Sequence, residues 1–138
     1  SQQYQLNRFK NDADSVILGT GIYWEGINVK GESLSQVIIY KLPFPVPDPI
    51  IDYKMSKAFD PINDVVVPEM IIKLRQGAGR LIRTSSDKGI VSILDPRVSE
   101  RCNPKYKQTV LDSLNVKNRI SSIEELQSFW DDLNGGTV

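Results

Sequence analysis

The chain has 138 residues, of which 40% are hydrophobic and 25% are charged, and its formal net charge is zero. This length and this mixture are typical of a single soluble globular domain. Cys102 is the only cysteine and there is no histidine, which excludes an internal disulfide, a cysteine-cluster metal site and any chemistry that needs a histidine of this chain.

The N-terminal part of the sequence predicts a helix, two strands and a proline-rich connection. Spaced apolar side chains in residues 3–10 indicate the end of a helix, and the apolar runs at 16–18 (VIL) and 36–40 (QVIIY) predict short buried strands. Residues 42–49 read LPFPVPDP, and four prolines in eight residues exclude a helix or a central strand. We expect a stiff extended connection there, with a ligand for aromatic grooves as the alternative.

Two helices are predicted next along the chain. The first covers residues 50–59, and the second begins at Pro68, which suits a first helical turn, and continues to about Thr84. Four apolar residues recur on one face of the second helix and are expected to pack on a sheet, namely Ile71, Leu74, Ala78 and Leu81.

The C-terminal part predicts a third strand and two further helices. Residues 89–94 (GIVSIL) form the strand, and residues 104–114 form a helix. Residues 121–124 (SSIE) have the spacing of a capping box, and the helix that they begin ends at the glycine pair 135–136. Strands that alternate with helices favour an α/β fold with a parallel sheet flanked by helices. Only three strands are convincing, so we expect part of the sheet to be missing.

The charges are unevenly distributed. Residues 73–107 contain nine lysines and arginines against three acidic residues, whereas residues 1–72 and 108–138 are both net acidic. An anionic partner is therefore expected at residues 73–107, with a solvated basic surface as the alternative. No apolar run reaches the roughly 20 residues of a membrane span, and the lone cysteine favours a reducing, cytoplasmic location.

Residues 19–31 (GTGIYWEGINVKG), here called the glycine-rich segment, follow the first predicted strand. A glycine-rich loop at the carboxyl edge of a parallel sheet presents backbone N–H groups where α/β folds bind ligands. Tyr23 and Trp24 suit either of two roles, which are stacking on bases and anchoring the loop in a core.

Residues 75–83 (RQGAGRLIR), here called the arginine segment, lie on the helix that begins at Pro68. Lysine, glutamine and arginine side chains share a second face of this helix, at Lys73, Gln76, Arg80 and Arg83. Guanidinium groups are planar forks of donors that match phosphate oxygens. Gly77 and Gly79 would let a ligand or another backbone come close, and the alternative is an exposed basic face with glycines at a tight helix–sheet contact.

The two segments together resemble motifs V and VI of the C-terminal helicase domain of the DinG/XPD family of superfamily 2 helicases, closest to bacterial DinG. Residues 19–49 (GTGIYWEGINVKGESLSQVIIYKLPFPVPDP) are similar to motif V with its following strand and proline-rich loop. Residues 75–97 (RQGAGRLIRTSSDKGIVSILDPR) are similar to motif VI with its Gln-x-x-Gly-Arg-x-x-Arg core. The resemblance covers about residues 1–114.

The resemblance implies a second RecA-like domain that closes over ATP held by a first one. Arg83 would be the arginine finger and Arg80 a second γ-phosphate contact, with Gln76 coupling the nucleotide to domain closure. One such arginine is worth about 10³–10⁵ in rate because it stabilises charge on the transferring phosphoryl group.

Motif V implies further contacts. Glu25, Gly26 and Asn28 match positions near the nucleotide and the interdomain cleft, although the family usually has Asp where this chain has Asn28, so an amide replaces that carboxylate. Four residues match the part of motif V at the single-stranded DNA, namely Thr20, Gly21, Tyr23 and Trp24.

The sequence has no P-loop and no Asp-Glu box, and it begins at Ser1 rather than at methionine. We therefore expect residues 1–138 to be one domain of a longer ATP-dependent DNA helicase with a role in DNA repair, inactive alone. ATP and Mg²⁺ would be bound mainly by the first RecA-like domain, and single-stranded DNA would be the other partner. Two alternatives stay open, which are the helicase-like body of a DinG-type exonuclease and a non-enzymatic binding module.

Overall fold

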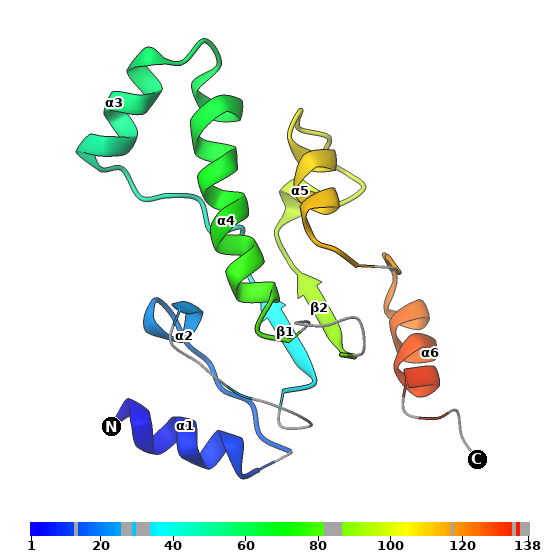
Figure 1. The fold of residues 1–138 in the computed structure, drawn as a ribbon. Coiled ribbons are helices and arrows are strands. Elements are labelled where there is room, and N and C mark those ends of the chain that lie inside the picture. The colour runs from blue at the N-terminus through cyan, green and yellow to red at the C-terminus, as the bar shows by residue number, and fades with distance from the viewer. Residues whose placement is uncertain are drawn as a thin grey trace.

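The computed structural model of the chain describes residues 1–12, 14–25, 29, 34–81, 87–116, 118–133 and 135, with the backbone alone at Ile22 and Glu25. The elements in chain order are α1 (Gln2–Lys10), α2 (Ile22–Glu25), β1 (Gln36–Ile39), α3 (Pro49–Lys57), the π-helical turn η2 (Ile62–Val66), α4 (Val67–Ala78), β2 (Ile90–Ile93), the 3-10 turn η3 (Pro96–Val98), α5 (Lys107–Ser113) and α6 (Ile123–Leu133). The mixed α/β fold that the sequence predicts is confirmed (Figure 1).

The sheet consists, within the described residues, of β1 and β2, which run parallel with Gln36 opposite Ile90 and Ile39 opposite Ile93. The strand predicted at residues 16–18 is wrong. Those residues belong to no strand or helix, and the side chains of Val16 and Leu18 are 83% and 90% exposed. An apolar run becomes a strand only by pairing, and no described strand pairs with this one.

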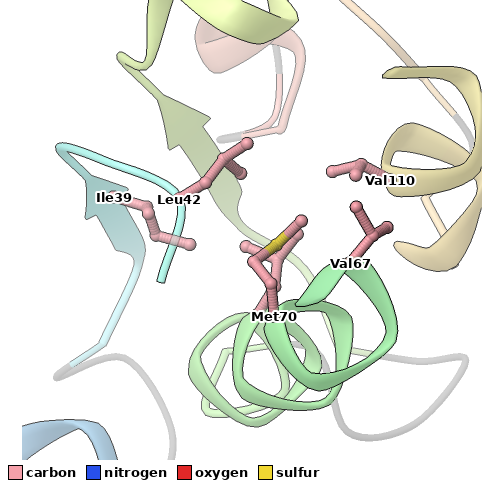
Figure 2. Packing of buried hydrophobic residues seen from close by; sticks show 6 residues of the cluster. Ile39, Leu42, Val67, Met70 and Val110 are labelled. Atoms are coloured by element: carbon pink, nitrogen blue, oxygen red, sulfur yellow. The ribbon is translucent and has the colours of Figure 1, made fainter. Parts of the chain in front are cut away.

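The core lies between the strands and α4. Figure 2 shows Met70 of α4 between Ile39 and Leu42 on one side and Val67 and Val110 on the other. Leu74 completes this cluster and, like Met70, is fully buried. Burial of such a side chain contributes about 1.5–3 kcal/mol to stability, so α4 is held firmly against β1 and α5.

Helix α4 confirms the predicted apolar face but not the predicted ends. Within that face Ala78 and Leu81 are buried and Ile71 is partly buried. The helix begins earlier, because the turn η2 leads directly into Val67. It also ends earlier, at Ala78, and residues 79–81 form a turn, so the predicted extension to Thr84 is wrong there; residues 82–84 lie outside the described residues.

Gly79 explains the early end. It is the C-cap of α4, and its N–H donates to the Arg75 carbonyl at 2.8 Å. Two glycines in three residues remove side-chain support from the last turn, and glycine costs about 1 kcal/mol relative to alanine inside a helix. The glycine-containing turn therefore releases Arg80 from the helix.

The proline-rich segment, residues 42–49, forms neither helix nor strand up to Asp48, as its prolines predict. Asp95, at the end of β2 and 2% exposed, fastens it: its carboxylate accepts the Leu42 N–H at 2.9 Å and the Arg97 Nε–H at 2.9 Å. The Arg97 guanidinium also lies over the Phe44 ring, 4.5 Å from its centroid. These contacts tie the carboxyl ends of β1 and β2 together.

The remaining predicted helices are present, with shifted ends. Helix α3 is capped by Asp48 and stops at Lys57, so Phe59 lies beyond it and is fully exposed. The cap of α6 is one residue later than the sequence suggested, since Ser122 Oγ accepts the Glu125 N–H at 3.1 Å. None of the helices in the described ranges is both long and apolar enough to cross a membrane.

Candidate functional site

The glycine-rich segment and the arginine segment, some fifty residues apart in the sequence, meet in the structure. Helix α2, from the first segment, packs against the C-terminal end of α4, from the second (Figure 1). Before α2 the backbone turns at Gly21, whose φ of +50° lies in the left-handed region that favours glycine. The turn then closes with the Trp24 N–H donating to the Gly21 carbonyl at 2.9 Å.

Trp24 makes the main contact between the segments. Its indole Nε1–H donates to the Lys73 carbonyl at 2.6 Å, and its ring lies directly over Gly77. A Cβ at Gly77 would be only 2.6 Å from Trp24 Cζ2, closer than real Cβ atoms come. Gly77 is therefore needed for a close ring contact, and for Trp24 this geometry favours the anchoring role over base stacking.

Arg80 lies just after α4 and beside α2. Its side chain is partly buried, and its Nη2 donates to the Trp24 carbonyl at 3.4 Å. Its backbone N–H donates to the Gly77 carbonyl at 3.3 Å, which continues the turn at the end of α4. The Trp24 carbonyl lies at the C-terminal end of α2, where carbonyls have no partner within the helix. The Arg80 guanidinium therefore satisfies one of these carbonyls.

The other predicted residues lie around this contact. Gln76 is exposed on α4, one helical turn before Arg80, and Thr20 is exposed in the loop before α2. Tyr23 is partly buried, with its ring against Gly19, where a Cβ would be 2.3 Å from Tyr23 Cδ2. Of the remaining predictions, Gly26, Asn28 and Arg83 lie outside the described residues, as does the side chain of Glu25.

The chemistry available here is hydrogen-bond donation to an anion. The guanidinium of Arg80 and the exposed amide of Gln76 both suit phosphate oxygens. In the described part of the chain, no group of three or more Cys, Asp or Glu is placed to hold a metal ion. The contact of Trp24 with Gly77 was not predicted from the sequence. The sequence features that pointed to it were a glycine within a predicted helix and a large aromatic residue in the glycine-rich segment.

A family model described as the helicase C-terminal domain matches residues 1–117. The ATP-dependent DNA helicase YoaA of Haemophilus influenzae is 40% identical over 129 residues, which are 90% of this chain and 20% of that protein. The ATP-dependent DNA helicase DinG of Photobacterium profundum is 37% identical over 116 residues, 80% of this chain and 16% of that protein.

A third relative is named an exonuclease rather than a helicase. The 3'-5' exonuclease DinG of Bacillus subtilis is 35% identical over 114 residues, which are 79% of this chain and 12% of that protein. The chain thus spans a fifth or less of the length of these three relatives.

Proposed function

Because the chain belongs to the helicase C-terminal domain family, we propose that it is the C-terminal part of a DinG-like ATP-dependent DNA helicase. Residues 1–138 would form a single second RecA-like domain, with motif V at about 19–31 and motif VI at about 75–83. One observation supports this most: Trp24 of the first motif packs on Gly77 and accepts a hydrogen bond from Arg80 of the second. We place the full-length enzyme in the cytoplasm.

Arg83 and Arg80 supply the catalytic charge in this proposal. They would face the γ-phosphate of ATP held by the first RecA-like domain, where positive charge stabilises the transferring phosphoryl group. Gln76 would sense the same nucleotide, and Glu25, Gly26 and Asn28 would line the cleft nearby. The exposed Gln76 and the guanidinium of Arg80 are the right donors for phosphate, and Mg²⁺ would be held by the first domain.

The glycine-rich segment forms the DNA side of the site. Thr20 and Gly21 are exposed and turn the chain sharply, so their polar groups can contact a single-stranded phosphate backbone. Tyr23 lies beside them as an aromatic surface. The basic residues of 73–107 add an attraction for DNA that weakens as salt rises.

The test is ATP hydrolysis by the full-length protein with single-stranded DNA at saturation. Arg83→Ala is expected to lower kcat about 10³-fold or more, and Arg80→Ala to lower it less steeply. Arg119→Ala, which removes an exposed arginine outside residues 73–107 and outside both motifs, serves as the matched control and should leave turnover unchanged. Near wild-type turnover in Arg83→Ala would remove the finger assignment.

The alternative is a full-length protein that acts mainly as a nuclease. Its support is the relative from Bacillus subtilis that is named an exonuclease. Degradation of labelled single-stranded DNA by the full-length protein, at the same rate with and without ATP, would favour this alternative over the helicase.

A further inference from the structure

Trp24 contacts three groups at the C-terminal end of α4. Its indole N–H donates to the Lys73 carbonyl, its ring covers Gly77, and its own carbonyl accepts from Arg80. All three partners lie on the last turns of α4 or just after it. The side chain fixes where Trp24 lies against α4, and the carbonyl of the same residue then contacts the arginine.

The same residue is bonded to the loop that we assign to DNA. The Trp24 N–H donates to the Gly21 carbonyl at 2.9 Å, and the Tyr23 N–H donates to the Thr20 carbonyl at 3.2 Å. Helix α2 is a single turn, so little backbone separates Thr20 from the Trp24 carbonyl. A bound strand that displaced this loop would therefore also move the Trp24 carbonyl that Arg80 contacts.

We propose that Trp24 is a positioning residue that couples the DNA loop at Thr20 and Gly21 to the orientation of Arg80. This role rests on the proposed function and goes beyond both roles that the sequence left open for Trp24, base stacking and anchoring of the loop. Gly77 is the second residue that this role requires. Only a residue without a Cβ lets the indole lie close enough to α4 to keep its hydrogen bond to the Lys73 carbonyl.

The fit of the ring gives a compensation test. Gly77→Ala places a Cβ against Cζ2, Cε2 and Cη2, which belong to the six-membered ring of the indole. A phenylalanine side chain is shorter and does not fill that space. Trp24→Phe in the Gly77→Ala background should therefore relieve the collision, although the N–H bond to Lys73 stays lost.

The experiment measures DNA-stimulated ATP hydrolysis by the full-length protein, with kcat and the KM for ATP determined separately. Gly77→Ala is expected to lower kcat about 10–100-fold, because a misplaced catalytic group loses rate. The KM should change less than about 3-fold, since uniform binding is not removed. The double variant should recover about 10-fold of the lost kcat. Trp130→Phe, the other tryptophan, is the matched control and should behave as wild type.

The outcomes separate this role from the proposed function. If Arg80→Ala lowers kcat while Gly77→Ala keeps wild-type kcat, the positioning role is overturned and the proposed function stands. If Gly77→Ala lowers kcat and Trp24→Phe restores none of it, the loss does not come from the ring and the role is again overturned. If the wild type shows no DNA-stimulated hydrolysis, the proposed function fails first.

Discussion

Two contacts in this protein join segments that are about fifty residues apart, and they do so by different physics. Asp95 joins β2 to the proline-rich segment through a buried carboxylate that accepts hydrogen bonds from Leu42 and Arg97. Trp24 joins the glycine-rich segment to α4 through a ring that fits where Gly77 has no side chain. The first contact depends on charge, and the second depends on shape.

The difference indicates what each contact is for. A buried carboxylate with several donors is costly to disturb, so the Asp95 contact holds the fold whatever is bound elsewhere. A ring against a glycine can shift by small amounts without leaving a charge unsatisfied. We therefore expect the Asp95 contact to dominate stability and the Trp24 contact to dominate the response to ligands.

The largest expected change in the free energy of unfolding comes from removing the charge of Asp95. Asp95→Asn removes the charge and replaces one acceptor oxygen by an NH2 group, and it should lower the free energy of unfolding by about 3 kcal/mol, because the Leu42 N–H and the Arg97 guanidinium then share a single neutral acceptor. Urea unfolding of the chain measures this. Asp112→Asn is the matched control: Asp112 accepts from Arg119 at 2.8 Å, but it is exposed, and its loss should hardly move the midpoint. Equal midpoints for the two variants would contradict the comparison.

The pH dependence of stability tests the same Asp95 contact in a second way. Hydrogen bonds from the Arg97 side chain and from the Leu42 and Arg97 N–H groups hold the pKa of Asp95 well below its usual range. The unfolded chain then binds more protons than the folded chain as pH falls below about 4, so wild-type stability falls with it. Asp95→Asn lacks this contribution. The difference in unfolding free energy between wild type and variant should therefore shrink from pH 7 to pH 2.5, and a constant difference would exclude a lowered pKa of Asp95 in the folded chain.

Local sequence patterns predicted most of the fold. Helix α4 was predictable because its apolar residues recur at helical spacing, and β1 and β2 because each is a short apolar run. The run at residues 16–18 looked the same and yet forms no strand, because pairing is not encoded within the run itself. The end of α4 was missed for a related reason: the apolar spacing continues to Leu81, while Gly79 ends the helix locally.

The site was predictable as two segments but not as a contact. Motif spacing predicted Gln76 and Arg80 as site residues, and this prediction depends on side-chain chemistry alone. The role of Gly77 depends on which ring lies over it, and that is decided by a residue more than fifty positions earlier. Gly19 was missed for the same reason, since its constraint comes from the Tyr23 ring. A sequence does not show why a glycine is needed until the side chains packed against it are known.

The smallest expected change in stability comes from Gly77→Ala, which tests the contact between Gly77 and the Trp24 ring. Gly77→Ala gains up to about 1 kcal/mol of helix propensity and loses about 1–3 kcal/mol from overpacking against the indole, so the net change should be a destabilisation of about 1 kcal/mol. In the Trp24→Phe background the collision is gone and the same substitution should stabilise. Because neither residue titrates, both changes should be the same at pH 7 and pH 4 in urea unfolding. A destabilisation of equal size in both backgrounds would mean that the ring of Trp24 does not limit residue 77.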